Sequence, residues 1–395
     1  MTSMKIALLT DGIYPFVLGG MQRHSGNVLK QMLERGHEVT LVHCVPWNAK
    51  EMPDRNTVME KIGLSNGAHF EAIVLRFPKP GILPGHYLKE SYQYARKIYD
   101  VLKSQISGFD FIYAKGFCAW HILHEKSRGA QMPPVGVKFH GYEMFQKDAN
   151  LKAKLQSLML RGPVRWNNTQ ADVVFSYGGH ITEIIKGLGV TEGHIAEVSG
   201  GIDPEWISLN DRKATQGIRK FLFIGRNERR KGIEELHSVL SKWEDTDPIE
   251  FHFIGPISQS VRLKKSYVNY HGSISDSAKI REIMDKCDVL VVPSFSEGMP
   301  NVILEGMARG MAVIASDVGA VNIEVDENTG WLIQPGDENA LRKAILIAAQ
   351  CSPRDLLLKQ SAARRKVKEL FLWPSVVKRL ETAIFRYTEA QDQVS

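Results

Sequence analysis

Short runs of apolar residues, rich in β-branched side chains, recur along this chain, and longer amphipathic segments separate them. In the first half the runs fall at residues 5–10, 38–43, 71–77, 110–114, 135–140 and 171–176. In the second half they fall at residues 220–224, 250–254, 268–271, 288–292, 311–315 and 331–333. Apolar runs of this kind are typical of strands buried on both faces of a sheet. Their alternation with helical segments, such as 21–35 and 87–104, predicts an α/β fold with parallel, doubly wound sheets.

A polar segment at residues 208–217 predicts a linker between two domains. A length of 395 residues is large for one hydrophobic core, so we expect domains at residues 1–207 and 208–372. The two halves repeat an architecture without a tandem repeat of sequence. Trp373 and Pro374 interrupt the helical pattern, and we expect a final helix over 374–388 with a frayed tail beyond it.

The composition is ordinary for a globular protein in water, with 43% hydrophobic and 24% charged residues. The formal net charge of +6 is mild and the basic residues are spread out, which argues against nucleic acid as a partner. The cysteines lie far apart, without the spacing of metal ligands, and we interpret them as reduced thiols: Cys44, Cys118, Cys287 and Cys351.

The sequence predicts a cytoplasmic protein. No apolar run approaches the roughly 18 residues needed to cross a bilayer, and the N-terminus does not resemble a signal peptide. The loop at 79–85 and the helix at 87–104 are basic and aromatic, so one interpretation is peripheral contact with the inner face of the membrane, or contact with an acceptor. The other interpretation is a crossover helix that packs on the sheet.

The most informative stretch follows the apolar run at 289–292. Pro293 ends the run, a turn of small residues follows, and helical spacing begins near Asn301. Such a turn directs backbone N–H groups toward a helix N-terminus, where an anion is favoured. Glu297 in that turn would repel a bare anion, but it could accept hydrogen bonds from hydroxyls attached to one, as in a sugar phosphate. Alternatively, Glu297 is a solvated loop residue, and Glu305 is a helix-face residue.

A basic loop at residues 225–232 follows the first apolar run of the second half. Arginine presents a planar fork to phosphate oxygens and lysine a mobile charge, so Arg226 and Lys231 suit a diphosphate. In this interpretation Arg229 and Arg230 do not contact the ligand. The alternative is a solvated basic loop.

Two strand ends in the first half carry further candidate contacts. Gly19 and Gly20 would allow a ligand close to the backbone, although a tight turn alone would also need them. Their spacing is not Gly-x-Gly-x-x-Gly, which argues against a dinucleotide oxidoreductase. His140 stands where the run at 135–140 ends, the position of ligands in open parallel sheets, although a lone histidine is usually structural.

Residues 296–301 (Ser-Glu-Gly-Met-Pro-Asn), followed by 304–306 (Leu-Glu-Gly), resemble the signature of the family 4 retaining glycosyltransferases of the GT-B fold. In that family, two glutamates separated by seven residues bind a nucleotide sugar. The resemblance implies that Glu297 contacts the donor sugar and Glu305 the ribose. It also implies that His140 lies over the donor sugar, so that His140 and Glu297 are the catalytic candidates. The diphosphate would be bound by Arg226, Lys231, Gly19 and Gly20, and the nucleobase would lie at Ile274. The loop that holds the sugar and phosphate would consist of Gly298, Met299, Pro300 and Asn301.

The resemblance further implies two Rossmann-like domains that face each other across a cleft. Residues 1–207 would form the acceptor side, completed by a C-terminal helix at 374–395, and residues 208–372 the donor side. One turn departs from the family pattern. Gly200 stands where asparagine is usual, which leaves a side-chain role at that position in question.

The implied activity is retaining, metal-independent transfer of a hexose from a nucleotide diphosphate donor, most often a UDP-sugar, to a glycan or lipid-linked acceptor, as in cell-surface polysaccharide synthesis. The nucleotide sugar is a substrate, so no cofactor is expected. No Asp-x-Asp motif stands in the expected donor loop, and Arg226 and Lys231 can neutralise the diphosphate, so no metal is expected either. The alternatives are a nucleotide-sugar epimerase or phosphorylase of the same fold, and a sensor that binds nucleotide sugars without catalysis.

Overall fold

The computed structural model describes residues 3–64, 69–83, 85–148, 151–213, 216–244 and 248–392, with side chains except at 151–156 and 390–392. Parts of the expected segments therefore lie outside the described residues. These parts are residues 1–2, 65–68 and 149–150 of the first domain, Pro84 in the loop at 79–85, Ala214 and Thr215 in the linker, residues 245–247 of the second domain, and residues 393–395 of the final segment.

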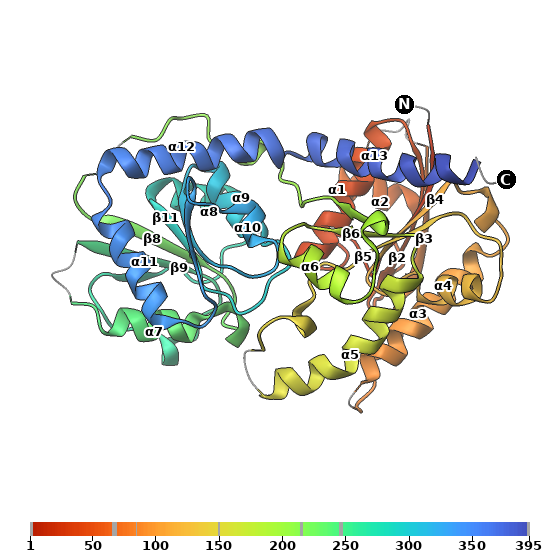
Figure 1. Cartoon of the computed structure of the whole chain (residues 1–395), viewed down its shortest axis with the longest axis horizontal. Coiled ribbons are helices and arrows are strands. Elements are labelled where there is room, and N and C mark those ends of the chain that lie inside the picture. Colours follow the sequence, from red (N-terminus) through yellow and green to blue (C-terminus); the bar gives the residue numbers. More distant parts are fainter. Residues whose placement is uncertain are drawn as a thin grey trace.

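Two parallel sheets organise the fold, which confirms the expected α/β class (Figure 1). The first sheet has seven strands in the order β3-β2-β1-β4-β5-β6-β7, and the second has six in the order β10-β9-β8-β11-β12-β13. The strands of the first sheet are β1 (Lys5–Leu9), β2 (Glu38–Val45), β3 (Phe70–Arg76), β4 (Phe111–Lys115), β5 (Val135–Lys138), β6 (Val173–Ser176) and β7 (Ile195–Glu197). Those of the second are β8 (Arg219–Ile224), β9 (Ile249–Ile254), β10 (Val268–Tyr270), β11 (Val289–Val292), β12 (Ala312–Ser316) and β13 (Gly330–Ile333).

Helices connect the strands and pack on the sheets. In the first half they are α1 (Gly20–Glu34), α2 (Arg55–Ile62), α3 (His86–Leu102), α4 (Trp120–Ser127), α5 (Leu151–Gln170) and α6 (His180–Gly187). In the second half they are α7 (Ile233–Ser241), α8 (Ser277–Lys286), α9 (Asn301–Ala308), α10 (Val321–Glu324), α11 (Glu338–Gln350) and α12 (Pro353–Leu370), and α13 (Trp373–Asp392) follows them. Over the described part of the chain, none of the helices combines the length and the apolar character needed to cross a bilayer.

The strands form where residues are apolar on both faces, as the sequence pattern predicted. In β1, Ile6 and Leu8 join a cluster with side chains of α1, α2 and α13, whereas Ala7 and Leu9 join another with side chains of α3 and α4. Every residue of β11 is buried. The first sheet is thus a middle layer between two layers of helices, with its strand ends directed at the second half.

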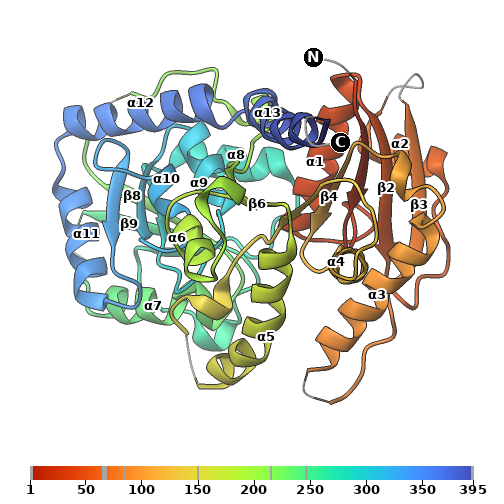
Figure 2. The ribbon, with the colours of Figure 1, turned by 45° about the vertical axis from the view of Figure 1, so that its right-hand side comes forward.

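The last helix crosses from the second half to the first. Figures 1 and 2 show α12 over one half and α13 over the other, where α13 packs against α1. Where the crossing begins, Ile202 N–H donates to the Phe371 carbonyl at 2.8 Å. The apolar face of α13 completes the core of the first sheet through Trp373, Val376, Val377, Leu380 and Ile384.

An ion cluster around the buried carboxylate of Glu381 fixes α13 on the first half. Glu381 is 2% exposed; its Oε2 accepts from Arg35 Nε at 2.8 Å, and its Oε1 lies 2.8 Å from His37 Nε2. Burial alone would raise the pKa of Glu381, but the hydrogen bonds from Arg35 and His37 hold the pKa below its usual value. The carboxyl group is therefore ionised in the folded protein at neutral pH.

We expect Glu381→Gln to lower the free energy of unfolding by about 3 kcal/mol, because it removes the negative charge that Arg35 and His37 face in a buried site. Urea unfolding followed by circular dichroism would measure the loss. A depressed carboxyl pKa stabilises the fold above the unfolded value of about 4.3, and this stabilisation disappears as the pH falls through the folded value. The variant and the wild type should therefore converge in acid.

The control is Glu369→Gln, at an exposed glutamate of α12, which should change the unfolding free energy little. Equal stability of Glu381→Gln and the wild type at neutral pH would contradict the role assigned to the ion cluster.

Candidate active site

A cavity of about 580 Å³ lies between the two halves, at the carboxyl ends of their strands. The first half lines it with residues that follow or end β1, β4 and β5, among them Asp11, Lys115 and His140. The second half lines it after β8 and β11, with Lys231 and the loop at 297–302. Open parallel sheets bind ligands at the carboxyl ends of their strands, so the fold itself makes this cavity the candidate site.

The loop after β11 touches the first half directly. A Cβ atom on Gly298 would lie 1.7 Å from the His140 carbonyl oxygen, so a residue with a side chain does not fit at this spacing. Gly20, at the start of α1, faces the same loop, because its Cβ would lie 3.9 Å from Asn301 Nδ2. The loop predicted to hold sugar and phosphate, 298–301, therefore lies on the cavity wall beside Gly20.

Glu297 is 6% exposed and held by groups from both halves. Its Oε1 accepts from Lys231 Nζ at 2.5 Å and from Ser294 Oγ at 2.7 Å, and its Oε2 lies 3.7 Å from Arg230 Nη1. Gln146 of the first half donates from Nε2 to the Glu297 carbonyl at 2.7 Å and accepts from its N–H at 3.3 Å. The carboxylate is thus fixed beside two cations where the halves meet.

The basic loop divides between the cavity and the surface. Arg226 is 69% exposed, pairs with Glu228 at 3.0 Å and is not among the described residues that line the cavity. Arg229 donates to Glu235 at 2.8 and 2.5 Å. Arg230 lines the cavity. Arg230 therefore lies at the candidate site and Arg226 does not, although the sequence interpretation assigned the ligand contact to Arg226.

His140 lies on the cavity wall as a neutral imidazole. Its Nδ1 is 2.6 Å from Tyr177 Oη, and its ring is edge-on to His24 with centroids 4.9 Å apart. Its Nε2 is buried and has no hydrogen-bond partner among the described residues. Burial, followed by the charges of Lys115 and Lys138, holds the pKa of His140 well below its usual value. The ring can therefore offer an uncharged polar group to a ligand.

Three more predicted contacts are not among the described residues that line the cavity. Glu305 is half-buried in α9, where burial raises its pKa to about 7 although the charge of Arg23 lowers it. Ile274 packs against the apolar core, and Gly19 immediately precedes α1. The contacts predicted for the sugar and phosphate thus lie mostly on the cavity, and those predicted for ribose and base do not line it.

Several cavity residues were not predicted. Lys115 is 1% exposed, and its Nζ lies 2.9 Å from His24 Nδ1 and donates to Tyr113 Oη at 3.2 Å. Asp11 follows β1, and burial raises the pKa of its carboxyl group. The one sequence signal for these residues was a charged side chain that ends an apolar run, as Lys115 does.

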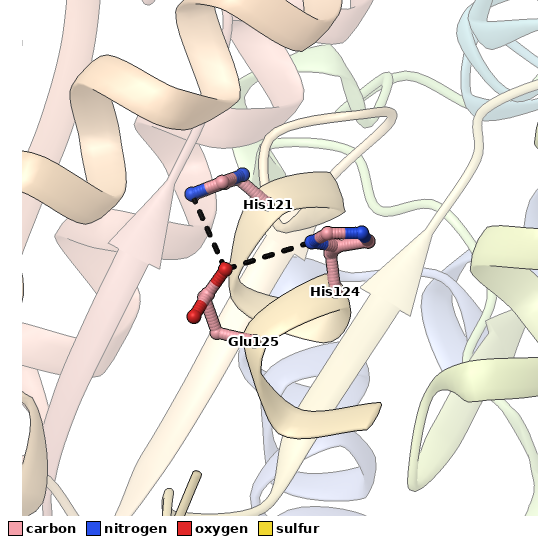
Figure 3. Close-up of side chains that lie close together, drawn as sticks. All are labelled: His121, His124 and Glu125. Atoms are coloured by element: carbon pink, nitrogen blue, oxygen red, sulfur yellow. Dashed lines mark ion pairs between the residues drawn. The ribbon is translucent and has the colours of Figure 1, made fainter. Parts of the chain in front are cut away.

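A separate cluster on α4 has the chemistry of metal ligands (Figure 3). His121 Nε2 and His124 Nδ1 lie 3.7 and 3.5 Å from Glu125 Oε1. Tyr92 Oη of α3 lies 3.0 Å from His121 Nδ1, and Arg128 Nη1 lies 3.7 Å from Glu125 Oε1. The cluster does not line the cavity, and a guanidinium already faces its carboxylate. We therefore assign it a structural role between α3 and α4.

Two family models match the chain. "Glycosyltransferase Family 4" matches residues 18–206, and "Glycosyl transferases group 1" matches residues 218–350. The chain is 28% identical over 190 residues to the amylovoran biosynthesis glycosyltransferase AmsK of Erwinia amylovora, covering 43% of this chain and 46% of that protein. It is 26% identical over 270 residues to the N,N'-diacetylbacillosaminyl-diphospho-undecaprenol alpha-1,3-N-acetylgalactosaminyltransferase of Campylobacter jejuni, covering 62% of this chain and 68% of that protein.

The alignments with the first curated relatives span less than half of those proteins' length. Similarity of fold extends much further. The sucrose-phosphate synthase of Thermosynechococcus elongatus superposes with a TM-score of 0.73 and 19% identity, over 98% of this chain and 100% of that structure. Together with the two parallel sheets that face the cavity, this likeness confirms the expected GT-B fold.

We expect Gly298→Ala to push the two halves apart, because its methyl group would overlap the His140 carbonyl. Small-angle X-ray scattering should then give a larger radius of gyration than for the wild type. Gly26→Ala on α1 is the control, since its Cβ meets nothing within 4 Å and the scattering should stay the same. Identical curves for Gly298→Ala and the wild type would mean that this contact does not set the spacing.

Proposed function

This chain belongs to the group 1, family 4 glycosyltransferases, and on that premise we propose the reaction that takes place in its cavity. The proposal is retaining transfer of a sugar, without a metal ion or cofactor, from a nucleotide diphosphate donor to a glycan or lipid-linked acceptor. A UDP-sugar is the proposed donor. The Erwinia relative is named for amylovoran biosynthesis and the Campylobacter relative for a diphospho-undecaprenol substrate, which supports polysaccharide synthesis on such an acceptor.

The observation that carries the proposal is the pairing of Lys231 with Glu297 on the cavity wall, Nζ to Oε1 at 2.5 Å. An ammonium group suits a diphosphate oxygen, and a carboxylate accepts hydrogen bonds from sugar hydroxyls. Side by side, they fit the two ends of a sugar phosphate. Arg230, 3.7 Å from the same carboxylate, adds a second cation on the phosphate side.

In the proposed mechanism, the leaving phosphate takes the proton of the incoming hydroxyl on the same face of the sugar. Breaking the bond between the anomeric carbon and the phosphate oxygen puts negative charge on the phosphate, which Lys231 and Arg230 stabilise inside the cavity. Arg226 is exposed and can turn toward the diphosphate, the role that the family resemblance implies for it. Glu297 holds the sugar hydroxyls while positive charge develops at the anomeric carbon, and the neutral His140 contacts the sugar from the first half.

The first half supplies the acceptor side in this proposal. Aromatic rings line its wall: Phe77, Tyr87, Tyr94, Phe117 and Phe139. Before α3, Ile82 and Leu83 are 99% and 77% exposed. We include in the proposal that these apolar side chains contact the cytoplasmic face of a membrane that carries a lipid-linked acceptor.

A panel of nucleotide sugars separates the proposed function from its alternatives. The protein is incubated with each donor, with and without an acceptor, and nucleotide release and sugar identity are measured. A transferase releases nucleotide faster with acceptor, an epimerase changes the sugar, a phosphorylase depends on inorganic phosphate, and a sensor binds without turnover. Failure to bind any nucleotide sugar would overturn the proposed function.

We expect Lys231→Ala to lower kcat/KM by about 100-fold, because the ammonium group stabilises charge that grows on the leaving phosphate. Initial rates of nucleotide release over a range of donor concentrations would measure the change. Lys242→Ala, at an exposed lysine after α7, is the control and should keep the wild-type rate. Arg226→Ala and Arg230→Ala, compared side by side, identify the arginine that serves the diphosphate. A wild-type rate in Lys231→Ala would place the diphosphate elsewhere.

Calorimetry with UDP should separate the two glutamates. Glu305→Gln removes charge-assisted bonds to ribose hydroxyls worth about 1.5–3 kcal/mol, so UDP affinity should fall by about tenfold or more. Burial raises the pKa of Glu305 to about 7, so the difference from the wild type should grow as the pH rises through that value. Glu297→Gln should keep UDP affinity and lower kcat, because UDP has no donor sugar. If Glu297→Gln lost UDP affinity and Glu305→Gln kept it, Glu297 would be the ribose contact and Glu305 the sugar contact.

A further inference from the structure

Two lysine side chains are buried at the carboxyl ends of neighbouring strands. Lys115 ends β4 and is 1% exposed, and Lys138 ends β5 and is 0% exposed. Lysine is almost never fully buried unless a partner offsets its charge. Within the described ranges, neither amine forms an ion pair with a carboxylate, and Asp11 and Cys118 act on Lys115 only from a distance. The positive charge of Lys115 is therefore poorly compensated by the protein.

The two amines differ in what surrounds them. Lys138 Nζ donates to the Val198 carbonyl at 2.7 Å and does not line the cavity. Lys115 does line the cavity, and its Nζ lies 2.9 Å from His24 Nδ1 and 3.2 Å from Tyr113 Oη. Lys115 can therefore contact a ligand, and Lys138 adds positive charge nearby.

The imidazole of His24 extends the same surface. An ammonium group has no acceptor atom, so a protonated Lys115 makes His24 Nδ1 the acceptor and places the ring proton on Nε2. His24 is 7% exposed and lines the cavity, and its Nε2 has no hydrogen-bond partner among the described residues. When Lys115 is protonated, these two residues of the cavity wall thus supply a positive charge and an unpaired N–H donor, which is the chemistry that binds an oxyanion.

We propose that Lys115 and His24 form a subsite for an oxyanion carried by the acceptor, either the carboxylate of an acidic sugar or the phosphate of a phosphorylated one. The proposal rests on the glycosyltransferase function above and names its substrate class. Lys115 belongs to the wall built by the first half, whereas Lys231 and Glu297 belong to the second. His24 contacts His140 with ring centroids 4.9 Å apart, so the subsite lies next to the position proposed for the donor sugar.

Proton uptake gives this subsite a measurable signature. Burial, reinforced by the charge of Lys138, holds the pKa of Lys115 well below its usual value. An oxyanion against the amine favours its charged form, so binding should draw a proton from solution at any pH where part of the amine is neutral. The titratable groups around Lys115 are Lys138, His24, His140, Asp11, Cys118 and Tyr113.

Three matched sugars test the proposal: methyl glucoside, methyl glucuronide, which carries a carboxylate, and glucose 6-phosphate. Each is titrated by calorimetry into the full chain saturated with UDP. We expect an acidic sugar to bind about tenfold or more tightly than methyl glucoside, and the preferred acid identifies the oxyanion as carboxylate or phosphate. Where the amine titrates, found by repeating the titration over a series of pH values, the heat of binding should differ between buffers of different ionisation heat and so report the proton uptake.

Lys115→Met keeps the length of the side chain without its charge and should abolish the preference for acidic sugars while UDP still binds. Lys89→Met, at an exposed lysine of α3, is the matched control and should keep the preference. Equal affinity for acidic and neutral sugars in the wild type, or a preference that survives in Lys115→Met, would overturn the proposal. Loss of UDP affinity in Lys115→Met would also overturn it, because the lysine would then serve the donor or the fold.

The UDP titration of the wild type tests the glycosyltransferase function separately from the oxyanion subsite. A wild type that does not bind UDP would overturn the glycosyltransferase function, and the subsite with it. A wild type that binds UDP without preferring acidic sugars would overturn the subsite alone. Because the preference for acidic sugars is measured on the wild type, the test does not depend on whether Lys115→Met folds.

Discussion

The close approach of the Gly298 backbone to the His140 carbonyl is the contact on which the candidate site depends. It joins the loop after β11 to the turn after β5, and a single methyl group at Gly298 would fall 1.7 Å from the carbonyl oxygen. Gln146 reinforces the contact by bonding the backbone of Glu297 at 2.7 Å. The strand ends of both sheets face each other around this contact, and the cavity with its Lys231–Glu297 pair lies beside it.

The strands were predictable because a parallel strand covered by helices on both faces has to be apolar throughout, as β11 is. The elements that the sequence missed lack this signature. β7 has three residues, none of them buried, and it pairs only with β6 in the sheet order. The helices α2 and α4 have eight residues each and bury few of them, so their amphipathic pattern is faint. Short elements at the edge of a fold are held by tertiary contacts that no local pattern records.

The residues of the site likewise divide into those with a local sequence pattern and those positioned by tertiary contacts. The turn at 297–301 was predictable because its chemistry is contained in consecutive residues, and the structure places that turn on the cavity wall. Arg226 and Arg230 could not be told apart from sequence, because the direction of each guanidinium depends on the fold around it; Arg226 pairs with Glu228 outside the cavity. Lys115 was missed for a related reason. A lysine at the end of a strand normally reaches solvent, and its burial here results from α1, which places His24 over its amine.

The crossing of α13 has a consequence for how the protein is made. The core of the first sheet includes side chains between Trp373 and Ile384, although the strands of that sheet are synthesised first. During synthesis on the ribosome, part of the apolar face of the early strands therefore stays uncovered until α13 has been made. The second sheet, whose last strand ends at Ile333, has all its strands before α13 emerges. The middle of the chain can thus fold before its beginning, and the face of β1 and α1 that α13 later covers is prone to aggregation in the interval.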